Sequence, residues 1–126
     1  MVTGVGGRVL VYAGRTLGLG TAFDTALSAP VSVAVGAGMI HVGSGVGVSA
    51  AVRAFNPADE FISADPAFEE VFADYARVAT ADLDADGGTD AVPGGRSAAP
   101  PRVRVLGRAI DFFAFDDTLR GGVFVG

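Results

Sequence analysis

The stretch Asp82-Leu83-Asp84-Ala85-Asp86-Gly87-Gly88-Thr89-Asp90 has the form D-x-D-x-D-G-x-x-D. Carboxylates stand at loop positions 1, 3 and 5, and Gly87 at position 6 permits a sharp reversal of the chain. The carbonyl of Gly88 at position 7 is expected to face inward, and Asp90 at position 9 closes the ring. Hard oxygen ligands at this spacing suit Ca²⁺, which takes six to eight of them. The sequence therefore predicts one calcium site, and its expected ligands are Asp82, Asp84, Asp86, the Gly88 carbonyl and Asp90.

The sequence on both sides of this acidic loop is of β type. An EF-hand needs a bidentate glutamate at position 12 and helices on either side, but position 12 here is Pro93. The preceding residues 75–81 alternate in polarity, and the following residues 91–95 end in Pro and Gly. We therefore expect the loop to join two strands. The alternative is a solvated acidic turn without an ion, because Asp and Gly are common turn formers.

The composition is that of a folded chain with short strands. Of 126 residues half are hydrophobic and 19 are glycine, which suits strands joined by tight turns. The net charge is −5, with arginine but no lysine, and no basic stripe points to nucleic acid as a partner. The chain has no cysteine and a single histidine, His41, so a zinc site is not expected.

The sequence shows no targeting segment. The first residues lack a charged segment followed by an apolar core, so no signal peptide is predicted. Residues 26–52 hold no formal charge, but they contain several glycines and alternate in side-chain size. A membrane-spanning helix needs about 20 predominantly apolar residues, so no membrane span is predicted there.

The chain contains a repeat. An apolar strand opens each copy at residues 9–12, 51–55 and 102–106, and a signature aspartate follows at Asp24, Asp65 and Asp116, spaced by 41 and 51 residues. The approximate copies are 8–49, 50–99 and 100–126, within a single β-repeat region that covers residues 1–126. The first copy has Val35-Gly36-Ala37-Gly38 in place of the acidic loop, so it has lost the ligands.

Repeats of about 40–50 residues with about four strands each have the period of propeller blades. The expected fold is therefore all-β and of propeller type, with about two and a half blades of four-stranded antiparallel sheet. Because two and a half blades do not close, we expect either a fragment of a longer array or self-association through open strand edges.

Residues 78–95 resemble the FG-GAP or VCBS-type repeat of integrin-like propellers, in which an apolar strand precedes the D-x-D-x-D-G-x-x-D loop and another follows it. Residues 101–123 are similar to the repeat arrays of this kind in large bacterial secreted or surface proteins. The resemblance implies that the acidic loop binds Ca²⁺. It also implies an adhesive or scaffolding role outside the cell, in contact with further repeats of the same array.

No catalytic motif accompanies the repeat. A Ser-His-Asp set could be written with Ser44 and His41, but no G-x-S-x-G elbow supports it. Phe112, Phe113 and Phe115 are expected to pack between blades, although they could form an aromatic binding platform. The sequence favours a non-catalytic structural or adhesive segment. The alternative is an accessory part of an extracellular carbohydrate-active enzyme, or a carbohydrate-binding module.

Overall fold

The structure, a computed structural model, describes residues 2–5, 7–12, 14–16, 18–26, 31–45, 49–68, 76–95 and 100–126. These residues form strands and turns, without a helix, and the strands make three antiparallel sheets. Sheet A holds β1 (Val2–Val5), β2 (Arg8–Tyr12) and β3 (Leu19–Asp24); sheet B holds β4 (Ser32–Gly36), β5 (Met39–Gly43), β6 (Ala51–Phe55) and β7 (Phe61–Pro66); sheet C holds β8 (Ala76–Ala81), β9 (Asp90–Gly95), β10 (Arg102–Val105) and β11 (Ile110–Phe113). The all-β class expected from the sequence is confirmed.

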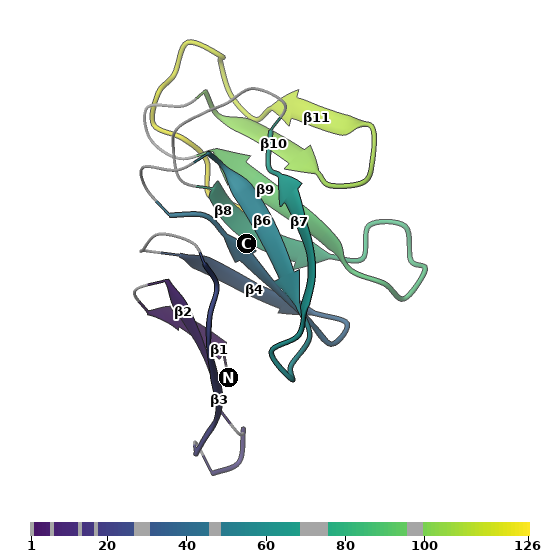
Figure 1. The fold of residues 1–126 in the computed structure, drawn as a ribbon. Helices are drawn as coiled ribbons and strands as arrows, with labels where there is room; N and C mark the ends of the chain where they lie inside the picture. Colours follow the sequence, from purple (N-terminus) through teal and green to yellow (C-terminus); the bar gives the residue numbers. More distant parts are fainter. Residues whose placement is uncertain are drawn as a thin grey trace.

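Each sheet is a meander in which strands that follow one another in the chain are hydrogen-bonded neighbours. Sheet B lies between the other two, with sheet A (purple) at one end and sheet C (green to yellow) at the other (Figure 1). The strand β4 contacts both β1 and β8, so the first strand of sheet B packs against a strand of each neighbouring sheet. In the part of the chain that the structure describes, the three sheets do not close into a ring.

Two apolar clusters hold the three sheets together. One lies between sheets A and B and contains the buried side chains of Val9, Val31, Ile40, Val42 and Phe55. The other lies between sheets B and C and contains Ala50, Val52, Ala67, Phe68, Ala76, Val78 and Ala91. Successive side chains of a strand point to opposite faces of its sheet. Sheet B therefore contributes to both clusters: in β6, Val52 lies in the cluster with sheet C and Phe55 lies in the cluster with sheet A.

The repeat can be followed in the sheets. Its opening strands are β2, β6 and β10, and each is the next-to-last strand of its sheet. Each copy therefore runs from the last two strands of one sheet into the first strands of the next. The short segment at residues 35–38 holds the end of β4 and the tight turn into β5, where Ala37 and Gly38 are both at positive φ (45° and 75°).

Candidate metal centre

The acidic loop joins β8 to β9, which pair along their whole length. Their register runs from Ala76 opposite Gly95 to Ala81 opposite Asp90, so the loop begins and ends at the last pair of the hairpin. β8 is also tied to sheet B: the Val78 amide donates to Ser32 Oγ (3.1 Å), and the Thr80 hydroxyl donates to the Val35 carbonyl (3.1 Å). The loop thus projects from a hairpin that is anchored on two sheets.

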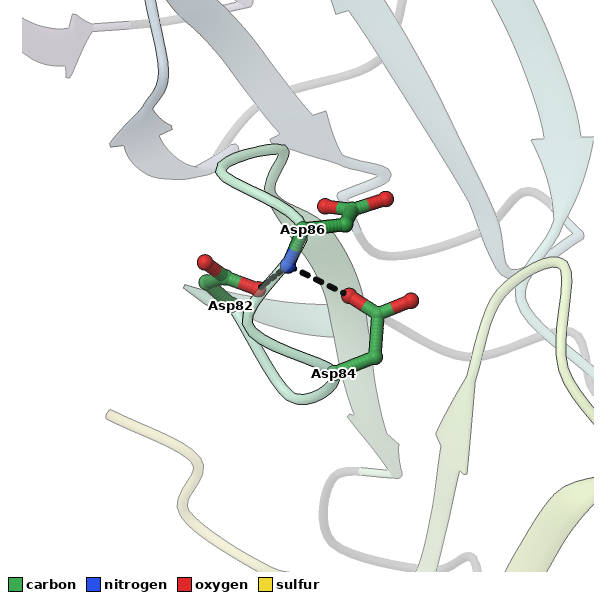
Figure 2. Close-up of side chains that lie close together, drawn as sticks. All are labelled: Asp82, Asp84 and Asp86. Carbon is green, nitrogen blue, oxygen red and sulfur yellow. Dashed lines mark hydrogen bonds between the residues drawn. The ribbon is translucent and has the colours of Figure 1, made fainter.

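Within the loop three carboxylates come together. Asp82, Asp84 and Asp86 are exposed, and one oxygen of each lies within 4.8 Å of the others. Figure 2 shows the three side chains around the backbone of the loop. The reversal that brings them together uses positive φ at Ala85 (59°) and at Gly87 (84°). The predicted role of Gly87 fits this backbone, since glycine adopts positive φ at little cost.

Backbone amides of the loop point at these carboxylates. The Asp86 amide donates to Asp82 Oδ1 (3.2 Å) and to Asp84 Oδ1 (3.3 Å), which are the dashed lines of Figure 2. The Gly87 amide donates to Asp82 Oδ2 (3.0 Å), and the Gly88 amide donates to Asp86 Oδ1 (2.7 Å). These bonds offset part of the repulsion among the three charges and hold the loop in shape. The inward orientation of the Gly88 carbonyl stays a prediction.

Asp90 lies outside this cluster and acts on the loop in another way. Its Oδ2 accepts the Leu83 amide (3.1 Å), which ties the end of the loop to its beginning. Its Oδ1 accepts a hydrogen bond from Nε of Arg108 (2.7 Å). Asp90 therefore closes the loop, and the clustered carboxylates are those of Asp82, Asp84 and Asp86. The role of Asp90 as a fourth carboxylate ligand stays a prediction.

Arg108 is the residue at this site that the sequence did not reveal. It lies in the turn between β10 and β11, and its guanidinium binds Asp84 Oδ2 (2.6 Å) as well as Asp90. It reaches the loop because β10 pairs with β9 at Val103 and Gly94, and because the Leu106 amide donates to the Ala91 carbonyl. No local signal marks this arginine, since only the pairing of β9 with β10 brings the two turns together.

The ion pair alters the acid–base behaviour of both partners. The hydrogen bond from Arg108 lowers the pKa of Asp84 below its ordinary value of 3.8, against a smaller opposing effect of desolvation. Hydrogen bonds to Asp90 and Asp84 raise the pKa of Arg108. A carboxyl whose pKa is lowered by folding contributes stability at pH above 3.8, and this contribution is lost as the pH falls through the folded-state pKa.

Replacing Arg108 by glutamine is expected to raise the pKa of Asp84 toward 3.8, because the guanidinium that favours the charged carboxylate is gone. The measurement is an NMR titration of the carboxyl carbons between pH 2 and 6. Arg102→Gln is the matched control, since Arg102 lies on the same β10–β11 hairpin and pairs with Asp111 (2.6 Å). An unchanged Asp84 titration in the Arg108 variant would show that the ion pair does not form in solution.

The other predicted features lie apart from the acidic loop. His41 is buried on β5, where burial lowers its pKa. Ser44 Oγ accepts the Ala51 amide (3.0 Å), so this hydroxyl binds the first residue of β6. Phe112, Phe113 and Phe115 are about half exposed, on and just after β11.

Comparisons of the chain with family models, with curated proteins and with solved structures gave no match. Within the described ranges no helix is long and apolar enough to cross a membrane. Residues 31–45 and 49–52 of the uncharged segment form β4, β5 and the beginning of β6 with their turns.

Proposed function

We propose that this chain is a calcium-binding β-repeat segment of the FG-GAP or VCBS propeller type, with a structural and adhesive or scaffolding role outside the cell. The observation that carries the proposal is the convergence of Asp82, Asp84 and Asp86 in the β8–β9 loop. The D-x-D-x-D-G-x-x-D spacing, the flanking strands and the meander sheets all agree with it. The chain acts without a catalytic group of its own.

The donor set fits a hard cation. All three side chains offer carboxylate oxygens, the ligands that Ca²⁺ prefers. Two oxygens bound to one Ca²⁺ at about 2.4 Å each lie no more than about 5 Å apart, and the separations within 4.8 Å satisfy this limit. The loop is exposed, so water can supply the remaining ligands. Calcium also tolerates irregular coordination better than magnesium, which demands a near-ideal octahedron.

The proposed ion competes with Arg108 for one carboxylate. Asp84 Oδ2 faces the guanidinium at 2.6 Å, so an ion that takes this oxygen weakens that ion pair. Arg108 keeps its second partner, Asp90, and the hairpin stays attached to the loop. Because the arginine must be displaced from Asp84, the affinity is expected to be modest, with a dissociation constant of about 10⁻⁴ to 10⁻³ M, as in extracellular modules.

The structural role follows from the place of the loop. Unpaired carboxylates repel one another and oppose formation of the β8–β9 hairpin, whereas a bound cation removes that repulsion. β8 carries Ala76 and Val78, which lie in the apolar cluster between sheets B and C. An ion that stabilises this hairpin therefore also stabilises the contact between the two sheets.

Titration with Ca²⁺ by calorimetry tests the proposal. We expect one binding event in the natural chain. The variant Asp84→Asn with Asp86→Asn is expected to bind at least about tenfold more weakly, because two charged ligands are lost while the amide oxygens can still accept the loop hydrogen bonds.

The matched control is the double variant Asp116→Asn with Asp117→Asn. It removes the same amount of charge from two adjacent, exposed residues in the turn region after β11. It should bind Ca²⁺ like the natural chain. Equal heats for the natural chain and for the loop variant would rule out the acidic loop as the site.

A further inference from the structure

Three glycines occupy equivalent places in the three sheets: Gly4 in β1, Gly43 in β5 and Gly94 in β9. A Cβ at Gly4 would lie 3.2 Å from the Val31 carbonyl oxygen, and one at Gly43 would overlap the Ala76 carbonyl oxygen. Val31 directly precedes β4 and Ala76 begins β8, so each glycine lies where the first strand of the next sheet crosses. A Cβ at Gly94 would lie 3.3 Å from the carbonyl oxygen of Val123. Val123 therefore lies on sheet C at the place that corresponds to the start of β4 on sheet A and of β8 on sheet B.

Two hydrogen bonds in corresponding places support the equivalence of Val123 with Ala76. The Ala76 amide, at the start of β8, donates to the Ser44 carbonyl (3.2 Å), and Ser44 follows Gly43. The Val123 amide donates to the Gly95 carbonyl (2.7 Å), and Gly95 follows Gly94. Residues 124–126 also line one groove together with β4 and β8. We define residues 123–126 as the terminal segment, which lies on sheet C as β8 lies on sheet B.

Among the described residues, sheet A has three strands, and sheets B and C have four each. The place of Gly4 makes β1 the equivalent of β5 and β9, each of which pairs on one side with the first strand of its sheet. Among the described residues β1 pairs with β2 alone. Its other edge therefore presents amide and carbonyl groups in the position that β4 and β8 cover in sheets B and C.

We propose that the terminal segment of one molecule pairs with β1 of a second copy and supplies the first strand of its sheet A. The register follows from the two complete sheets, where Ser32 lies opposite Gly43 and Arg77 lies opposite Gly94. Phe124 is the equivalent of both Ser32 and Arg77. It therefore lies opposite Gly4 of the second copy, and Val125 lies opposite Thr3, in an antiparallel pair.

The faces that this contact brings together are apolar. A groove of about 400 Å³ on the open face of sheet C is lined by Val92, Val103, Ile110 and Phe112, beside the terminal segment. Val103 is the repeat equivalent of Val52, which is buried between sheets B and C. In the second copy, Leu10 and Tyr12 of β2 are the side chains that face this groove. Val9 and Val11 of the same strand point the other way, toward sheet B of their own molecule.

The contact joins two different surfaces, the sheet C end of one molecule and the sheet A end of the next. Figure 1 shows these two sheets at opposite ends of the fold. Such a head-to-tail contact leaves one free end of each kind on every dimer. The assembly therefore either closes into a ring or continues as a chain of copies.

Cross-linking between two single-cysteine variants tests the pairing, since the natural chain has no cysteine. Thr3→Cys, made in ¹⁵N-labelled medium, is mixed with unlabelled Val125→Cys under mild oxidation, and mass spectrometry identifies mixed dimers. Directly opposite residues of antiparallel strands have Cα atoms about 4.5–5.5 Å apart, within the range of a disulfide. We expect mixed dimers to form at least about tenfold faster than in the control mixture of Val2→Cys with Val125→Cys, which is out of register by one residue.

Sedimentation velocity of the natural chain from about 5 to 200 μM is the second measurement, and the average mass is expected to rise with concentration. A monomer over that whole range, with no more mixed dimer than in the control mixture, would overturn the proposal. Association with equal cross-linking in both mixtures would also overturn it, because the copies would then meet without the predicted register.

Discussion

Replacing Gly43 by alanine is expected to lower the free energy of unfolding by about 3 kcal/mol, the upper part of the range for overpacked sites. The added Cβ would overlap the carbonyl oxygen of Ala76. This oxygen belongs to the backbone, so it cannot move away by a rotamer change. Relief requires β8 to shift from β5, which would disturb the apolar cluster between sheets B and C. Urea denaturation followed by circular dichroism measures the loss.

The matched control is Gly121→Ala, where a Cβ would meet nothing within 4 Å. That variant is expected to stay within about 0.5 kcal/mol of the natural chain. If both glycine variants unfold at the same urea concentration, β5 and β8 do not cross as closely as described. A Gly43 variant that fails to fold while the control folds agrees with the prediction.

Calcium is expected to stabilise the natural chain by about 2.7 kcal/mol at a free concentration one hundred times the dissociation constant. The reason is mass action: an ion that binds the folded loop and not the unfolded chain shifts the equilibrium toward the folded state. Thermal melts in Ca²⁺ and in EDTA measure the difference. The rise in melting temperature is expected to grow with the logarithm of the calcium concentration.

The Asp84→Asn and Asp86→Asn variant is expected to show at most about half of this stabilisation at the same free calcium concentration, because a site at least about tenfold weaker gains no more than about 1.4 kcal/mol there. A calcium-dependent shift of equal size in this variant and in the natural chain would place the ion elsewhere. The result does not depend on the head-to-tail pairing, because the proposed calcium ligands lie in the acidic loop and none of them lies in the terminal segment. The two proposals can therefore fail separately.

The interval between the carboxylates explains why the candidate site was visible in the sequence. Asp82, Asp84 and Asp86 alternate in a short loop, and a local reversal at Gly87 is sufficient to bring them together. The strands beside the loop were visible for a similar reason, since alternation along residues 75–81 depends only on the period of an extended chain. The turn at residues 37–38 is also a local feature.

Long-range pairing decided the rest of the site. Asp90, predicted as a calcium ligand, lies outside the cluster of Asp82, Asp84 and Asp86, and its carboxylate accepts hydrogen bonds from the Leu83 amide and Arg108. Its role as a ligand stays a prediction. The partner of Asp84, Arg108, is 24 positions along the chain and reaches the loop through the pairing of β9 with β10. Sequence spacing carries no information on such a contact, because the energy that favours it arises only when the sheet has formed.

The sequence by itself determined that the chain is all-β, that it repeats and that three aspartates share one loop, because each follows from local periodicity and composition. Only the tertiary structure decided where one sheet ends and the next begins, since opening strands of the repeat turned out to be the next-to-last strands of sheets A, B and C. It also decided that Gly4, Gly43 and Gly94 share one role, which depends on the close approach of a backbone from the next sheet. Packing between sheets is a property of segments distant in the chain, and no local pattern encodes it.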